Sequence, residues 1–309
     1  MARRGRHRRA PRHRGATVFL VLLSVGASSV LGIGLLRHGA PTRALGETPT
    51  AAARFLGNVA TTTSSTTTTT VPDRNPLASP EMQSLLKGRK GVITAAVYDV
   101  ATERTYVANP GTYEVAASMV KSDILAALLY KAQVEHRSLT KQEDALARTM
   151  ILNSDNDAAQ TLYHEIGERD GLMRFDAQLG FETTKPDWGW GNWQITPTDE
   201  LTLLKNIALP SAVLSNESQN YARSLMEHIG STGRFGIAIG PSTGTTVGFK
   251  NGWYHETSTG WQLNSAGWVH SGRTFYIAVI ETQGSPTEDY GIQTANQFGT
   301  LLWQFETMP

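Results

Sequence analysis

The chain has 309 residues, of which 40 % are apolar, and a formal net charge of +1. Seven arginines lie in the first fourteen residues, whereas residues 44–309 contain 19 Lys and Arg against 27 Asp and Glu. This acidic balance argues against nucleic acid as a partner. The absence of cysteine excludes both a disulfide framework and a lipid-modified cysteine.

The N-terminal part combines a basic segment, residues 1–15, with an uncharged apolar run at residues 16–36. A helix of 21 residues crosses a hydrocarbon core of about 30 Å. Because a basic flank stays in the cytoplasm, we expect a membrane anchor that contacts the lipid bilayer through residues 16–36. The C-terminal part would then lie outside the cytoplasm. A cleaved secretory signal is the alternative, and the protein would in that case be secreted.

Residues 44–75 differ in composition from the rest of the chain. They are rich in Thr, Ala, Pro and Ser and include ten consecutive hydroxyl residues at 61–70. Such a segment cannot build an apolar core. We expect a disordered, extended stalk whose threonines are candidates for glycosylation.

Residues 76–309 have the pattern of one domain of mixed class. A helix at 80–88 precedes a hairpin of strands at 91–100 and 104–107, and a long helical block follows. The block is predicted to contain helices at 118–131, 140–152, 158–166, 170–179, 197–207 and 217–229. Strands are then predicted at 245–250, 260–270 and 273–281, before a closing helix at 289–305. This order predicts an α+β fold with an antiparallel sheet formed by N- and C-terminal segments and an inserted all-helical subdomain.

The stretch Ser118-Met119-Val120-Lys121 is the first candidate for chemistry. Residues three apart on a helix lie on one face, with Cβ atoms about 6 Å apart, so the lysine amine reaches the serine hydroxyl. A neutral amine there accepts the hydroxyl proton, provided that burial or a nearby cation lowers the lysine pKa. The pattern is short enough to occur by chance, and its interpretation depends on two further motifs.

Those motifs are Ser154-Asp155-Asn156 and Lys250-Asn251-Gly252, the second at the end of a predicted strand. Each also has a purely structural interpretation. Ser154 and Asn156 are suited to cap a helix that begins near Ala158, and Asn-Gly is a common hairpin dipeptide.

Taken in order, the three motifs resemble the S-x-x-K, S-D-N and K-T-G pattern of penicillin-recognising serine enzymes, the class A β-lactamases and penicillin-binding proteins. The resemblance covers most of residues 76–309 and includes the segments 154–159 and 261–267. It implies the β-lactamase/transpeptidase-like fold. It also implies a substrate that is a β-lactam or a peptidoglycan-derived D-alanyl peptide.

The resemblance assigns catalytic roles to three residues. Ser118 would be the nucleophile, Lys121 its proton acceptor or relay, and Ser154 would pass the proton to the leaving amine. The expected substrate-binding residues are Asn156, Lys250, Asn251, Gly252 and Trp253. Among these, Lys250 would attract a substrate carboxylate and keep Lys121 neutral, and the backbone N–H groups of Ser118 and Trp253 would form the oxyanion hole.

The sequence departs from this pattern in three ways. Asn251 stands where the family usually has threonine, and its amide is expected to donate to a substrate carboxylate instead. The loop at 181–196 lacks the family's glutamate, which activates the deacylating water; its carboxylates are Glu182 and the shorter Asp187. The gap from Ser118 to Ser154 is also short. The sequence thus supports formation of an acyl-enzyme better than its hydrolysis.

Other chemistry has little support in the sequence. No H-E-x-x-H motif occurs, and we expect no metal and no cofactor; we also expect a monomer. Trp188, Trp190 and Trp193 line a ligand groove or cover the core. The main hypothesis is an extracytoplasmic, membrane-anchored serine hydrolase, and the alternative is a catalytically inactive wall-binding or regulatory domain.

Overall fold

The computed structural model describes residues 74–231 and 233–308. The predicted basic segment, the anchor at 16–36 and nearly all of the stalk at 44–75 lie outside this range. Within the described range, no helix is both long enough and apolar enough to cross a bilayer.

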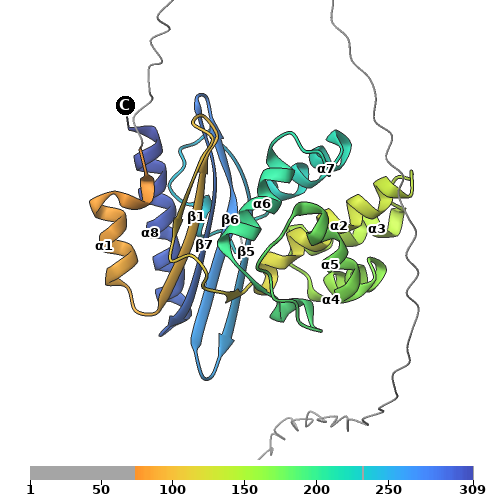
Figure 1. Ribbon diagram of the computed structural model, residues 1–309, viewed down its shortest axis with the longest axis horizontal. Coiled ribbons are helices and arrows are strands. Elements are labelled where there is room, and N and C mark those ends of the chain that lie inside the picture. The colour runs from red at the N-terminus through yellow and green to blue at the C-terminus, as the bar shows by residue number, and fades with distance from the viewer. Residues whose placement is uncertain (1–73, 232, 309) are drawn as a thin grey trace, which may run out of the picture. The chain divides into compact units, whose positions relative to one another are not determined.

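A five-stranded antiparallel sheet forms the centre of the described residues (Figure 1), with strand order β2-β1-β7-β6-β5. Its strands are β1 (Val92–Asp99), β2 (Arg104–Ala108), β5 (Thr246–Glu256), β6 (Gly260–Ser271) and β7 (Thr274–Ser285). β1 pairs with β7 along its full length, from Val92 opposite Gln283 to Asp99 opposite Tyr276. The prediction that N- and C-terminal segments share one sheet is confirmed.

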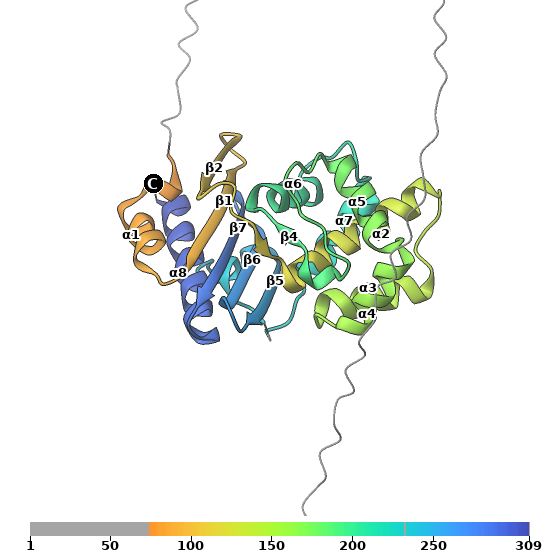
Figure 2. The same cartoon turned by 60° about the horizontal axis from the view of Figure 1, so that its bottom comes forward.

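The two faces of the sheet carry different layers (Figures 1 and 2). One face packs against α1 (Pro80–Gly88) and α8 (Glu288–Thr307) through Ala95, Val97 and Phe298. The other packs against the helical subdomain through Ala96, Tyr98 and Val279. The subdomain contains α2 (Lys121–Val134), α3 (Lys141–Leu152), α4 (Asn156–Glu165), α5 (Glu168–Leu179), α6 (Pro197–Ala208) and α7 (Asn216–Met226). Successive residues of a strand face opposite sides, which explains the alternation in β1.

Short elements complete the fold. The 3₁₀ turns are η1 (Pro76–Ala78), η2 (Ala117–Val120), η3 (Trp190–Asn192) and η4 (Gly236–Ala238). A two-stranded sheet of β3 (Glu114–Val115) and β4 (Gln194–Ile195) joins the segment before η2 to the loop that contains η3.

Two predicted boundaries were wrong at places that matter for the site. The helix expected from residue 118 begins at Lys121, because residues 117–120 form the tighter turn η2. The strand expected to end at residue 250 continues to Glu256, because β6 pairs with it throughout. Lys250-Asn251-Gly252 therefore lies within a strand, and the hairpin interpretation of Asn-Gly was wrong.

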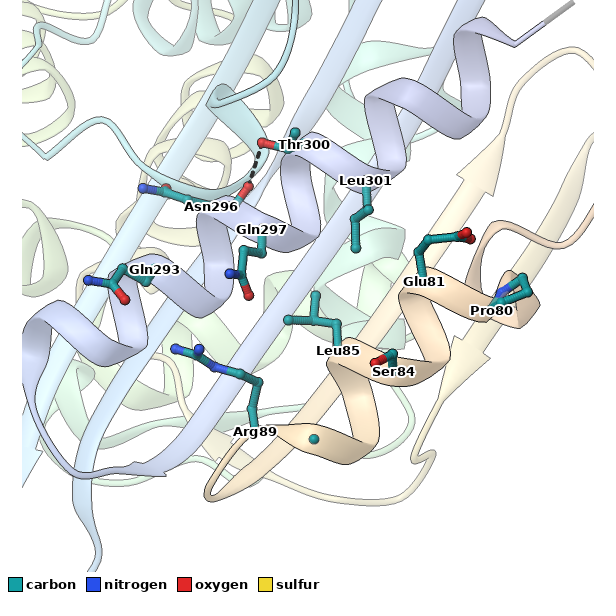
Figure 3. Close-up of a pocket in the computed structure, with 11 residues that line it drawn as sticks. Pro80, Glu81, Ser84, Leu85, Arg89, Gln293, Asn296, Gln297, Thr300 and Leu301 are labelled. Carbon is teal, nitrogen blue, oxygen red and sulfur yellow. Dashed lines mark hydrogen bonds between the residues drawn. The ribbon is translucent and has the colours of Figure 1, made fainter.

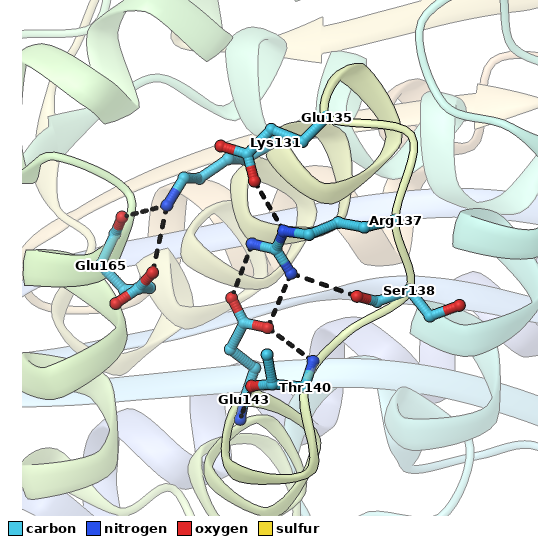
Figure 4. A network of polar contacts seen from close by, with 7 residues as sticks. All are labelled: Lys131, Glu135, Arg137, Ser138, Thr140, Glu143 and Glu165. Carbon is cyan, nitrogen blue, oxygen red and sulfur yellow. Dashed lines mark hydrogen bonds and ion pairs between the residues drawn. The ribbon is translucent and has the colours of Figure 1, made fainter.

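The connection between α2 and α3 is held by a polar network (Figure 4). The Glu143 carboxylate accepts hydrogen bonds from Arg137 at 2.8 and 2.9 Å and from the Thr140 N–H at 2.7 Å. The Thr140 hydroxyl in turn accepts from the Glu143 N–H, which completes a capping box at the start of α3. The network fixes the start of the helix that leads into the Ser154 motif.

A cavity of about 1050 Å³ lies between α1 and α8 (Figure 3), on the face of the sheet opposite the helical subdomain. Its charged groups are Glu81 and Arg89. The Arg89 guanidinium lies 3.7 Å from the centre of the Tyr290 ring and donates to the Thr294 hydroxyl at 2.8 Å. None of the three motifs lines this cavity.

Several carboxyl groups are buried between the sheet and the helical subdomain: Asp123, Asp176, Asp199, Glu200 and Glu281. Burial raises the pKa of Asp176 and of Glu200 to about 8, and neighbouring carboxylates add to both shifts. Burial and the Glu200 charge also raise the pKa of Asp123 well above its ordinary range. Asp123, Asp176 and Glu200 are therefore largely protonated near neutral pH.

The buried carboxyls predict that stability falls as pH rises from about 4 to about 8, because across that range the folded state holds protons that the unfolded state has released. Asp176→Asn should flatten this slope by up to about 1.4 kcal/mol per pH unit. The measurement is urea unfolding at several pH values, with the exposed Asp170→Asn on the same helix as control. Equal slopes in wild type and Asp176→Asn would contradict the assignment.

Candidate active site

The three motifs meet at one cavity of about 530 Å³ between β5 and the helical subdomain. η2 contributes Ser118, the connection from α3 to α4 contributes Ser154, and β5 contributes Lys250. The other predicted site residues in the lining are Asn156, Asn251 and Trp253. Segments separated by more than 130 positions in the chain thus form one site.

Lys121 connects two of the motifs. Its Nζ lies 2.9 Å from the Ser118 Oγ, 2.6 Å from the Ser154 carbonyl oxygen, 2.7 Å from the Asn156 Oδ1 and 3.2 Å from the Ser154 Oγ. The side chain is fully buried. No carboxylate is recorded among the hydrogen-bond partners of Nζ within the described residues.

This set of partners suits a neutral amine. The Ser154 carbonyl and the Asn156 Oδ1 can only accept, so they take the two N–H groups of an uncharged amine. The lone pair is then left for the Ser118 hydroxyl. Burial lowers the pKa of Lys121 to about 8, although the Asp155 charge opposes the shift. At pH 7 about a tenth of the amine is then neutral, a far larger share than at the ordinary lysine pKa.

A second amine lies on the other side of Ser154. The Ser154 Oγ is 3.0 Å from the Lys250 Nζ, which also donates to the Asn251 carbonyl at 2.8 Å. Burial and the charge on Lys121 lower the pKa of Lys250 to about 7, and Glu200 opposes this. Two such close amines disfavour each other's protonation, so the pair gives up a proton readily.

Two of the six non-glycine residues with a left-handed φ in the described part of the chain lie at the site. Ala117, directly before Ser118, has φ = 49°, and Ser154 has φ = 54°. A left-handed conformation at a non-glycine residue costs about 1–3 kcal/mol and persists only where surrounding contacts enforce it. Here the Asp155 side chain caps α4 by accepting from the Ala158 N–H at 2.7 Å. Asp155 therefore forms the cap that the sequence suggested for Ser154 or Asn156, and Ser154 and Asn156 face Lys121.

β5 passes so close to η2 that only glycine fits at position 252. A Cβ on Gly252 would lie 2.4 Å from the Ala116 oxygen and 3.0 Å from the Ser118 nitrogen. The strand backbone thus lies against the nucleophile turn, and Trp253 follows directly. The Trp253 indole is 41 % exposed and packs edge-on to Phe235 at the rim of the cavity.

Asn251 has a different position from the one expected. Because strand residues alternate, it faces away from Lys250 and Gly252. Its Nδ2 donates to the carbonyl oxygens of Gly233 and Phe235 at 2.8 and 3.1 Å. Both amide N–H groups are therefore engaged, and the predicted donation to a substrate carboxylate does not fit this geometry. The side chain instead holds the 233–235 segment against the strand.

The loop at 181–196 gives each tryptophan a different environment. Trp193 is buried in the core, Trp188 is 78 % exposed beside Arg169, and the Trp190 ring centre lies 5.1 Å from the Lys121 Nζ. Of the two loop carboxylates, Asp187 is exposed and accepts from the Gly189 N–H at 3.2 Å. Glu182 is likewise exposed. Neither is hydrogen-bonded to Ser118 or Lys121.

The sequence interpretation named Trp190 only as one of three tryptophans that line a groove or cover the core, gave Asp155 no role of its own, and did not single out the buried carboxyls. The sequence does hold a signal for two of these carboxyls, because Asp123 is a charged residue within an apolar helix and Glu281 is one within an apolar strand. Trp190 gave no such signal, since a tryptophan in a loop is compatible with many roles. Within the described residues no group of His, Asp and Glu is arranged to hold a metal ion.

Comparison with known proteins gave a family and a fold. The model of the β-lactamase enzyme family matches residues 143–305, just over half of the chain. A class A β-lactamase from Bacteroides cellulosilyticus is similar in structure, with a TM-score of 0.67 and 18 % identity over 75 % of this chain and 99 % of that one. The chromosome-encoded β-lactamase of Vibrio parahaemolyticus gives a TM-score of 0.65 and 15 % identity over 74 % and 98 %. The TLA-1 extended-spectrum β-lactamase gives 0.66 and 17 % over 73 % and 96 %. No curated protein matches in sequence.

The contacts of Lys121 predict the effect of removing the Asp155 charge. Asp155→Asn keeps a capping side chain on α4 but removes the carboxylate that raises the pKa of Lys121. The pKa of Lys121 should therefore fall below about 8. NMR titration of isotopically labelled lysine side chains measures it, with the exposed Asp157→Asn, two residues further along the chain, as a control. An unchanged or raised pKa in Asp155→Asn would contradict this account.

Proposed function

Because the chain belongs to the β-lactamase enzyme family and is a serine hydrolase of that type, we propose that it forms an acyl-enzyme on Ser118. The substrate would be a β-lactam or a D-alanyl peptide of the cell wall. The observation that carries the proposal is the 2.9 Å contact between the Lys121 Nζ and the Ser118 Oγ, with two pure acceptors on the same amine.

Acylation follows from these contacts. Neutral Lys121 takes the Ser118 proton while the Oγ attacks the carbonyl carbon. The Ser154 hydroxyl, between the two amines, passes a proton to the leaving nitrogen as the C–N bond breaks. Backbone N–H groups of Ser118 and Trp253 would stabilise the developing oxyanion. Lys250 would supply positive charge toward a substrate carboxylate at the cavity.

Hydrolysis of the acyl-enzyme has less support. Deacylation needs a base that activates a water for attack on the acyl carbon. The two loop carboxylates, Glu182 and Asp187, make no hydrogen bond to Ser118 or Lys121, and Lys121 is the remaining candidate base. We therefore expect slow turnover of β-lactams, so that the acylated form accumulates.

Location is a second part of the proposal and rests on the sequence alone. The apolar run at 16–36 would anchor the protein in the membrane with residues 76–309 outside the cytoplasm. Cleavage of the N-terminal segment would instead release the same domain.

Covalent labelling tests the acyl-enzyme. Incubation with a fluorescent penicillin should add one penicillin mass to the peptide that contains Ser118, and Ser118→Ala should abolish the label, because it removes the nucleophile. The exposed Ser84→Ala is the control and should label like wild type. An unlabelled wild-type protein that still melts cooperatively would instead favour the inactive wall-binding or regulatory domain.

Fractionation tests the anchor. The full chain should sediment with membranes and resist extraction by carbonate, because a helix of about 20 apolar residues stays in the bilayer. A chain that begins at residue 44 should be soluble. Recovery of the full-length chain, with its N-terminus intact, in the soluble fraction would rule out the anchor.

A further inference from the structure

Trp190 occupies a distinctive position beside Lys121. Its ring centre lies 5.1 Å from the Lys121 Nζ. The other neighbours of this amine are Ser118, Ser154 and Asn156. Ser118 lines the 530 Å³ cavity, but of the described residues neither Lys121 nor Trp190 belongs to its lining. The indole therefore covers the amine on a side that the cavity does not reach.

The spacing leaves no room for water between the two groups. A water hydrogen-bonded to the amine at about 2.8 Å and in contact with the ring at about 3.5 Å would need roughly 6 Å in line. The observed 5.1 Å is shorter. Water thus reaches Ser118 from the cavity, past Ser154 and Lys250, but not from the Trp190 side.

The indole is fixed in this position by its surroundings. Its Nε1 donates to the Gln160 Oε1 at 3.1 Å, and the turn η3 is closed by the Asn192 N–H donating to the Gly189 carbonyl at 3.0 Å. The Ala116 N–H, two residues before the nucleophile, donates to the Trp193 carbonyl at 2.8 Å. The loop and the segment that leads into the nucleophile turn are therefore joined by a direct backbone hydrogen bond.

We propose that Trp190 sets the lifetime of the acyl-enzyme by excluding water from the Lys121 side of the ester. This inference rests on the proposed function and deepens it. In hydrolysis, the water oxygen bonds to the acyl carbon, one water proton moves through Lys121 to the Ser118 Oγ, and the C–Oγ bond breaks to release the acid. Trp190 is a positioning residue in this scheme, because an indole N–H can only donate and has no basic atom.

The site without Trp190 would admit that water. Lys121 transfers the Ser118 proton during acylation and is free to act as base again once the ester has formed. Truncation of the indole opens space next to the Lys121 Nζ, so that a water can lie within hydrogen-bond distance of this amine. Acylation should slow, because a less buried Lys121 amine has a higher pKa and is more often protonated. The contacts of Lys121 with Ser118, Ser154 and Asn156 do not involve the indole and should remain.

The test compares two tryptophans in the same loop. Trp190→Ala and Trp188→Ala are labelled with the fluorescent penicillin, excess reagent is removed, and loss of the adduct is followed by intact-protein mass spectrometry. We expect Trp190→Ala to lose the adduct about tenfold faster than wild type and Trp188→Ala to match wild type within about twofold. Trp188 is the matched control because its ring lies beside Arg169 and is exposed.

Two further variants separate water exclusion from general damage. Trp190→Phe keeps an aromatic ring over Lys121 and should restore a long-lived adduct. Gln160→Ala keeps the indole but removes the acceptor for its Nε1, and should shorten the lifetime less than Trp190→Ala does. The labelling rate is measured separately, so that slower acylation is not mistaken for faster loss of the adduct.

The outcomes distinguish the inference from the function on which it rests. A wild-type protein that is never labelled on Ser118 overturns the proposed function, and the inference with it. Labelled proteins with equal lifetimes in wild type, Trp190→Ala and Gln160→Ala overturn the inference alone. A Trp190→Phe adduct as short-lived as that of Trp190→Ala also overturns it, because an aromatic cover would then not be what matters.

Discussion

The site depends on a lysine amine kept out of water. A buried amine is costly unless its N–H groups find acceptors, and here the acceptors are a backbone carbonyl and an amide oxygen from the same short connection between α3 and α4. The two N–H groups of a neutral amine satisfy both acceptors, and its lone pair is then left for Ser118. The left-handed conformation of Ser154 is part of the same arrangement, since it presents the carbonyl and the hydroxyl of one residue to the amine.

The surroundings of this amine differ from one side to the other. Toward the cavity lie Ser154 and Lys250, which can pass protons and attract an anionic substrate. Away from the cavity lies Trp190, which can do neither. Under the proposed function, this arrangement would favour transfer of an acyl group to Ser118 over its release.

The sequence predicted the fold class and most elements, because periodicity and motif order are local properties of the chain. Thr140 marked the start of α3 through its capping pattern, and the start of α1 was correct at Pro80. The end of β5 was not predictable, because the pairing with β6 that extends the strand past Gly252 is a tertiary contact. The prediction that Asn251 donates to a substrate carboxylate was wrong for the same reason. With the true strand boundary, its side chain faces the other side of the sheet.

The pairing of β1 with β7 has a consequence for the order in which the chain is synthesised and folds. Strand partners at Asp99 and Tyr276 are separated by most of the domain, and contacts so distant in sequence form late in folding. Ser118 and Lys121 are synthesised early, yet Lys250 and the glycine that lets the strand touch the nucleophile turn belong to the last quarter of the chain. A nascent or C-terminally clipped chain therefore carries the nucleophile without the groups that complete its site, and reactivity toward an acyl donor would report completion of the fold.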